Sequence, residues 1–173
     1  MTDDFDFSFR FHVSSVAVRK IWAWAAASEV EISGLGEVLV EGNALRLTER
    51  VVLPAQRGSP GSTQTTHQAL LALTDALLAQ GIDPCPFRLW FHSHPQMSAF
   101  FSGTDETTIQ DLSRLWSPCV AVVINDLGET TWRVVWNGIS TEWACEPPSL
   151  ALTPKERRDA AQTLTPVTKF RHR

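Results

Sequence analysis

The sequence contains no tyrosine and only three cysteines among its 173 residues. Cys85, Cys119 and Cys145 are widely separated, and no two of them have the C-x-x-C spacing. An odd number of scattered cysteines argues against a disulfide framework. We therefore expect free thiols that pack in the core, and a reducing, cytoplasmic compartment.

The chain also lacks an excess of basic residues, since its net charge at pH 7 is −4. Non-specific binding to nucleic acid needs clustered Lys and Arg, so we expect no nucleic-acid partner. Basic side chains gather only in residues 153–173, which hold six of them against two acidic ones. This tail is either a solvated terminus or a segment that docks on an acidic partner, and the pattern leaves both open.

Long hydrophobic runs are absent as well. Unbroken apolar runs such as Val120 to Ile124 are far shorter than the roughly 20 residues that span a bilayer. The acidic first residues, MTDDFDFSF, lack the apolar segment of a signal peptide. We expect one globular domain over residues 1–147, a basic and partly helical tail over 148–173, and no membrane contact.

Hydrophobic periodicity predicts an α/β fold in which helices flank a mixed sheet. Alternating phenylalanines predict one strand over residues 5–13, and Ser14 or Ser15 can cap a helix that ends near residue 28. Further strands are expected at 35–41, 44–53, 87–91, 118–126, 130–138 and 139–146, and further helices at 66–81, about 104–116 and 154–163. Residues 54–64, rich in Pro, Gly and Ser, are expected to form a loop.

The most informative segment runs from His92 to Asp105. His92 and His94 are two apart at the end of a predicted strand, so their imidazoles share one face of the sheet. Pro95 ends the strand, and Asp105 follows near the start of the next helix. Two imidazoles and one carboxylate suit one Zn²⁺ ion, and three protein ligands leave its fourth position open, as in catalytic zinc sites.

Such a site needs a group that moves protons, and Glu31 is the candidate. It precedes Ser33, Gly34 and Gly36, small residues that would allow a close backbone approach to the metal loop. Glu29 lies two residues earlier and is a rival by position alone.

Glu31-x-x-Gly34, followed by His-Ser-His-Pro, six further residues and Ser102-x-x-Asp105, resembles the motif of the JAMM or MPN-plus (JAB domain) zinc metalloproteases. The resemblance implies a mixed sheet between helices, similar to cytidine deaminases. It implies zinc on His92, His94 and Asp105, Glu31 as general acid and base, and Ser102 as a group that stabilises the oxyanion. The Ser-x-x-Asp spacing is equally typical of a helix capping box.

By the same resemblance, the substrate is a ubiquitin-like protein whose C-terminal tail binds as an added strand and is cut after its last glycine. The sequence has no room for the long insertions of eukaryotic deubiquitinases, so it resembles compact prokaryotic members. Those are often encoded beside ubiquitin-like proteins and their activating and conjugating enzymes, some in anti-phage operons.

Three other functions are alternatives to compare with the residues. Processing of a sulfur-carrier protein would use the same chemistry. A silent scaffold would usually have lost the ligands that this chain retains. A nucleobase deaminase needs Pro-Cys-x-x-Cys, and Pro118-Cys119 is not followed by the second cysteine. A cysteine in the zinc's fourth position would instead make a dormant site.

Overall fold

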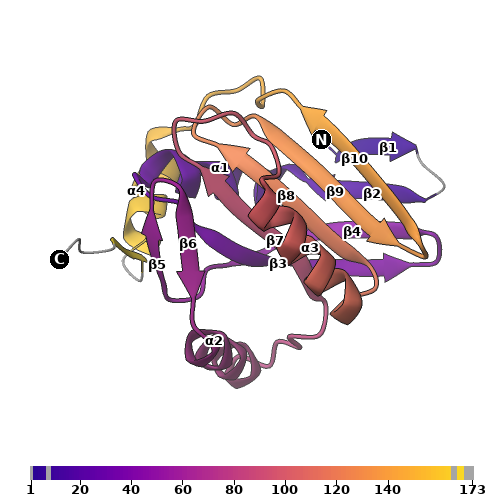
Figure 1. Ribbon diagram of the computed structural model, residues 1–173. Helices are drawn as coiled ribbons and strands as arrows, with labels where there is room; N and C mark the ends of the chain where they lie inside the picture. The colour runs from indigo at the N-terminus through magenta and orange to yellow at the C-terminus, as the bar shows by residue number, and fades with distance from the viewer. Residues whose placement is uncertain (1, 7–8, 165–166, 170–173) are drawn as a thin grey trace.

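The computed structural model describes residues 2–6, 9–164 and 167–169, and most of its strands form one mixed sheet (Figure 1). In spatial order the strands are β1 (Thr2–Asp6), β2 (Arg10–Ser14), β4 (Ala44–Val52), β3 (Ser33–Glu41), β7 (Phe87–His94), β8 (Cys119–Asn125), β9 (Thr130–Trp136) and β10 (Ile139–Cys145). Two neighbouring pairs, β2 with β4 and β7 with β8, are parallel, and the others are antiparallel. The α/β prediction is confirmed.

Helices cover both faces of this sheet. Figure 1 shows α1 (Ser15–Ala27) behind the sheet and α3 (Gly103–Leu115) in front of it. β8 lies between them, and all seven of its residues are buried, as expected of a strand that is apolar throughout. α2 (His67–Ala79) and α4 (Pro154–Thr163) lie away from the sheet's centre.

The sheet curls, and aromatic side chains fill the space that the curl encloses. Phe11 on β2 makes edge contacts with Trp132 on β9 and Trp143 on β10, with ring centroids 5.8 and 6.0 Å apart. These strands lie at opposite ends of the sheet order, so the contacts require that the sheet bends back on itself. Large rings suit this position because each buries a large apolar area in a specific edge geometry.

The prediction of one strand over residues 5–13 was wrong. β1 and β2 form an antiparallel pair in which Phe5 lies opposite Phe11. Period-two alternation is the same in one long strand and in the two arms of a hairpin, so the pattern could not locate the reversal. Phe9, Phe11 and Val13 are buried, whereas the side chains of Phe5 and Phe7 lie outside the described part of the chain.

The prediction of a loop over residues 54–64 was also wrong. β5 (Gln56–Ser59) and β6 (Ser62–Thr65) form a hairpin, and β11 (Val167–Lys169) adds to β5 as a parallel third strand. The hairpin residues are mostly small and polar, so composition indicates a loop, and its strands are held by tertiary contacts.

The C-terminal tail packs against the domain. The predicted helix at 154–163 is confirmed, and Leu152 and Ala160 are buried in the core. The Arg19 guanidinium on α1 donates to both carboxylate oxygens of Glu156, at 2.7 and 2.8 Å, and to the Leu150 and Ala151 carbonyls. The tail is therefore no solvated terminus over its described residues, while the boundary at 147/148 stays a prediction.

The described helices were compared with the requirements of a membrane-spanning helix. Within the described residues, none combines the length and the apolar character that a bilayer span requires.

Replacing Arg19 by Met should lower the free energy of unfolding at pH 7 by about 1–2 kcal/mol, because four charge-assisted hydrogen bonds are lost. The hydrogen bond from Arg19, with those from Thr153, lowers the Glu156 pKa to about 2. A depressed carboxyl pKa stabilises the fold above the unfolded pKa, so the loss should shrink as pH falls from about 5 towards 2. Denaturant unfolding at several pH values measures it.

The matched control is Arg114→Met, which removes an exposed pair with Asp111. We expect less than about 0.5 kcal/mol there. An equal loss in both variants would contradict a structural role for the Arg19 clamp.

Candidate metal centre

Strand β7 brings the two histidines to one face of the sheet. Leu89 and Phe91 point into the hydrophobic core, whereas Trp90, His92 and His94 alternate onto the opposite face. The Trp90 ring stacks on His92, with centroids 4.5 Å apart and planes 18° from parallel. Trp90 is itself held by a hydrogen bond from its Nε1 to the Ser33 hydroxyl, 2.8 Å long.

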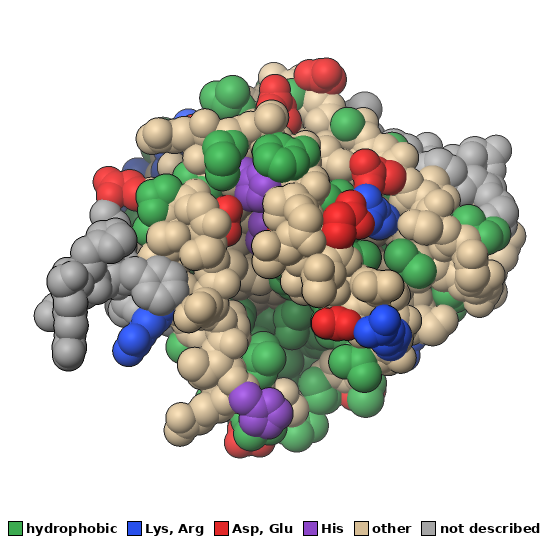
Figure 2. Space-filling model, in the orientation of Figure 1, with side chains coloured by type: hydrophobic (Ala, Val, Ile, Leu, Met, Phe, Trp, Pro, Cys, Tyr) green, Lys and Arg blue, Asp and Glu red, His purple; other side chains and the backbone are tan. Residues whose placement is uncertain are grey.

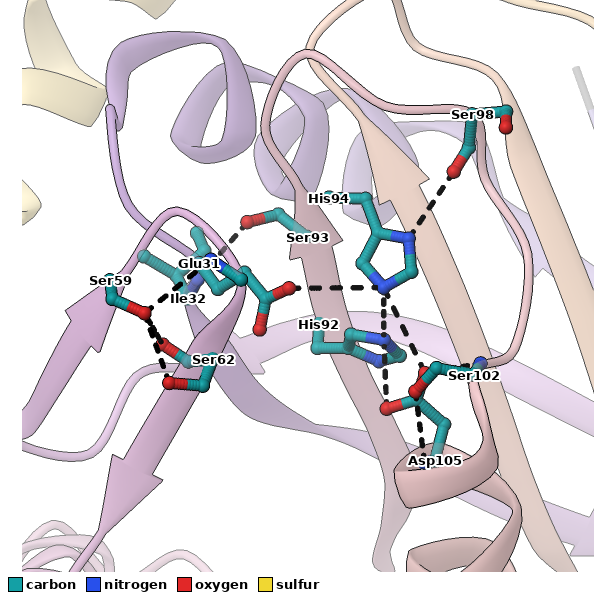
Figure 3. A network of polar contacts seen from close by, with 11 residues as sticks. Glu31, Ile32, Ser59, Ser62, His92, Ser93, His94, Ser98, Ser102 and Asp105 are labelled. Carbon is teal, nitrogen blue, oxygen red and sulfur yellow. Dashed lines mark hydrogen bonds and ion pairs between the residues drawn. The ribbon is translucent and has the colours of Figure 1, made fainter.

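Three side chains bring their ligand atoms together in a group that could hold one metal ion (Figure 3). The Nε2 atoms of His92 and His94 are 3.2 Å apart, and His92 Nε2 is 3.2 Å from Asp105 Oδ1. His94 Nε2 lies 3.8 Å from Asp105 Oδ2. With metal–ligand bonds of about 2.0–2.1 Å, the edges of a tetrahedron are about 3.3 Å long, which both distances from His92 match. With one ligand atom from each residue, the three atoms lie within 4.8 Å of one another, so the group could hold one ion.

Asp105 reaches the site because it lies in the first turn of α3. Ser102 is the N-cap: its hydroxyl accepts a hydrogen bond from the Asp105 N–H, and Asp105 Oδ2 accepts one from the Ser102 N–H at 2.7 Å. This is a capping box. It fixes the carboxylate, so Ser102 has the structural role that the spacing predicts, whatever it adds to catalysis.

The remaining imidazole nitrogens differ in their surroundings. His94 Nδ1 lies 3.2 Å from the Ser98 carbonyl, which favours a proton on Nδ1 and leaves Nε2 free to bind a metal. His92 Nδ1 is buried without a hydrogen-bond partner among the described residues. Stacking on Trp90 therefore orients the His92 ring.

The backbone around Glu31 is anchored on both sides. The Glu31 N–H donates to the Ser59 carbonyl at 2.8 Å, from the β5–β6 hairpin. The Ile32 N–H donates to the Ser93 hydroxyl at 3.0 Å, and the Ser93 N–H donates to the Ile32 carbonyl at 2.9 Å. Ser93, between the two histidines, thus ties the Glu31 segment to the strand that carries them.

Glu31 faces the three candidate metal ligands and is not one of them. Its Oε1 is 3.9 Å from His94 Nε2, too far for a shared hydrogen bond and close enough for a small molecule held at the site to contact both. Glu29 is exposed at the surface, so the geometry selects Glu31 over its rival.

Gly34 is required by the sheet itself. A Cβ atom there would lie 2.3 Å from Phe91 Cζ and 2.4 Å from the Val52 carbonyl oxygen. The close approach is therefore to strands β7 and β4, and the expectation that this glycine makes room for the metal loop was wrong. Gly34 sets how near Glu31 comes to β7.

Burial and mutual repulsion shift the acids of the site in opposite directions. Burial first, and then the Asp105 charge, raise the Glu31 pKa to about 7. Burial alone would raise the Asp105 pKa, but hydrogen bonds and charge from His92, with hydrogen bonds from Ser102, lower it to about 2. Burial and the neighbouring His92 lower the pKa of His94, so its imidazole stays neutral and able to bind metal.

Figure 2 shows histidine and carboxylate surfaces at the bottom of a hollow, with hydrophobic side chains on its rim. Phe100 is 48% exposed, and its ring lies 5.1 Å from the His94 ring. A substrate can therefore reach Phe100.

Comparison with known proteins identifies the fold. A family described as prokaryotic homologues of the JAB domain matches residues 41–138, more than half of the chain. The chain belongs to this family. The matched range of this JAB domain contains His92, His94, Ser102 and Asp105, whereas Glu31 precedes it. Members of the JAB family include zinc isopeptidases.

Two curated proteins are similar over most of the chain. The 26S proteasome non-ATPase regulatory subunit 14 of Caenorhabditis elegans is 28% identical over 156 residues, which is 88% of this chain and 48% of that protein. The protein of the same name from Drosophila melanogaster is 28% identical over 133 residues, 75% of this chain and 42% of that protein. The JAB chain thus spans less than half the length of these relatives.

The cysteines lie far from the candidate centre. Cys119 is four residues along β8 from Val123, the partner of His92, or roughly 13 Å at about 3.3 Å per residue. Cys85 precedes β7 at the end opposite to His92, and Cys145 lies on β10, three strands away. A thiol ligand in the fourth position is therefore excluded for this structure. The expectation of core thiols holds for Cys119, which is buried, but Cys85 is exposed.

Sequence reasoning named the residues that converge here but missed those that hold them. Ser93, Ser33 and Trp90 are common residue types with no spacing that marks them, and their roles depend on strand register. Gln56 was assigned to a loop, yet it is buried against the Glu31 segment. The sequence holds only a weak signal for Gln56, a long polar side chain two residues after Pro54.

The raised Glu31 pKa predicts that the metal-free Glu31→Gln variant is more stable than the wild type at pH 8, by on the order of 1–3 kcal/mol. The sign follows because the folded state keeps a proton that the unfolded chain has already lost, so stability falls as the pH rises from the unfolded pKa to the folded one and stays lower above it. The difference should vanish near pH 4. Urea unfolding of chelator-treated protein measures it.

Glu49→Gln removes the same charge from an exposed position and serves as the control. Added zinc should reduce the advantage of Glu31→Gln, since a nearby cation favours ionised Glu31. A variant less stable than wild type at pH 8 would contradict the burial argument.

Proposed function

We propose that this JAB domain is a zinc-dependent isopeptidase that hydrolyses the bond after the C-terminal glycine of a ubiquitin-like protein. The observation that carries the proposal is a group of three candidate ligand atoms, within 4.8 Å of one another, beside a buried glutamate that is not among them. Three protein ligands leave a position for water, which is typical of catalytic rather than structural zinc sites. The family membership and the similarity to a proteasome subunit support a protein substrate.

Zinc held by His92, His94 and Asp105 would supply Lewis acidity and bring the pKa of a coordinated water to roughly 7. The chain's own groups do the rest. Glu31, whose pKa lies near neutrality, accepts a proton from water and returns it to the leaving amine. The Ser102 hydroxyl hydrogen can rotate toward an oxyanion on the carbonyl carbon while its oxygen caps α3.

The hairpin offers an edge for an extended substrate tail. In the three-stranded sheet β6 is an edge strand, and Figure 1 places it on the side of β5 that faces β7 and α3. A tail added to β6 as a further strand would run past Glu31 toward the zinc ligands. Main-chain hydrogen bonds would bind it with little regard to its side chains, as in strand addition generally.

Helix α2 supports binding of a folded substrate body. It follows β6 directly, and Leu77 is its only residue buried against the described part of the domain. Leu70, Leu71 and Leu78 are exposed. Several exposed leucines on one helix can form an interaction surface, and we propose that the ubiquitin-like fold packs here.

Glu31→Gln should keep about one zinc per chain and lose hydrolysis by at least ~100-fold, since Glu31 moves protons and binds no metal. His94→Ala should lose zinc and activity together. Zinc content by mass spectrometry and cleavage of a panel of ubiquitin-like proteins, each fused through its C-terminal glycine to a reporter, test both. Loss of zinc from Glu31→Gln would sink the assignment.

Leu71→Asp should lower kcat/KM for a ubiquitin-like fusion about 10-fold by raising KM, because it places a charge on the proposed docking face. Cleavage of a short peptide that carries only the substrate's tail should change little. The control is Leu115→Asp, an equally polar change at an exposed leucine at the end of α3. Equal effects of Leu71→Asp on the fusion and the short peptide would rule out a docking role for α2.

A further inference from the structure

We propose that Gln56 is a positioning residue for Glu31, and that its side-chain amide takes the place of a missing strand beside Ser33. The inference rests on the proposed hydrolase function. Its observations are independent of that function, because they concern how the backbone of residues 31–33 is held.

Gln56 is almost completely buried, and every polar atom of its amide is used. Its Oε1 accepts from the Ser33 N–H at 2.7 Å and from the Thr63 hydroxyl at 3.0 Å. Its Nε2 donates to the carbonyls of Ser33 and Pro54, at 2.8 and 3.0 Å. A carboxamide has two donors and two acceptor sites, so this side chain has no hydrogen-bonding capacity left to spare.

The two bonds to Ser33 reproduce those of a neighbouring strand. Ser33 pairs with His92 of β7 on one side. On the other side the pairing of β3 with β4 begins only at Leu35, opposite Val52. Buried backbone groups need partners, and the Gln56 amide supplies both the acceptor and the donor that β4 does not provide.

The β5–β6 hairpin, which carries Gln56, also contacts the backbone of Glu31 directly. Ser59 accepts from the Glu31 N–H, and a Cβ atom at Gly58 would lie 2.5 Å from the Glu31 carbonyl oxygen. β5 can therefore lie against the segment only with glycine at this point. On its outer edge β5 pairs with β11, opposite Gln56 and Gly58, so the C-terminal strand supports the same two residues.

The consequence is that Glu31 is located from two directions. Ser93 fixes Ile32 to the metal-binding strand, and Gln56 fixes Ser33 to the hairpin. A general base must lie within hydrogen-bond reach of the proton it takes, and a displacement of about 1 Å can cost roughly 100-fold in rate. Gln56 should thus act on kcat, through Glu31, without touching substrate or metal.

The test is Gln56→Met, which keeps a similar side-chain length and removes all four hydrogen bonds. In the zinc-loaded protein, hydrogen exchange at the Ser33 amide should accelerate at least ~10-fold, with α1 unchanged. With a short peptide substrate, kcat should fall at least ~10-fold while KM and zinc content stay within about twofold. Gln110→Met, an exposed glutamine on α3, is the matched control.

A double-mutant cycle separates positioning from general damage. In the Glu31→Gln background, Gln56→Met should change the residual rate less than about twofold, because the group it positions is already gone. An equal fall of kcat in both backgrounds, an unchanged kcat, or unchanged exchange at Ser33 would overturn the proposal. A wild type that cleaves no substrate would overturn the proposed function instead, and the exchange result would then decide whether Gln56 holds the segment.

Discussion

The register between β3 and β7 is the constraint on which the rest of the site depends. Ser33 lies opposite His92. The Ile32 N–H donates to the Ser93 hydroxyl, and the Ile32 carbonyl accepts from the Ser93 N–H. A slip of one residue would turn the histidines into the core and move Glu31 away from them. Gly34 protects this register, since any side chain there would collide with Phe91.

The site balances two opposite demands on its carboxylates. Asp105 is held ionised by the capping box and His92, as the proposed metal ligand must be, whereas Glu31 is kept near its protonation midpoint by burial and by Asp105. Metal-assisted hydrolysis is expected to use two acids with different pKa values, one as a candidate metal ligand and the other to move protons. The cost is a buried acid that weakens the metal-free fold at neutral pH.

A feature could be predicted from the sequence when the residues that form it lie close together along the chain. The His92–Asp105 segment is local, and its period-two spacing and capping box indicated both the shared face and the helix start. The Phe5–Val13 alternation was equally local but could not distinguish a strand from a hairpin. Gln56, Ser93 and Arg19 act across 23, 61 and 137 positions of sequence, and no local pattern marks such contacts. The JAB resemblance supplied the order of elements, whereas the β5–β6 hairpin and the docked tail became visible only in three dimensions.

The zinc K-edge X-ray absorption spectrum of the zinc-loaded protein, compared with that of its Glu31→Gln variant, can test this arrangement of ligands. We predict two imidazoles and oxygen donors only, four ligands in all, with no sulfur and with the same spectrum in both proteins. A sulfur ligand, a single imidazole, or a first shell that changes when Glu31 is replaced would contradict a three-residue centre with a free glutamate beside it.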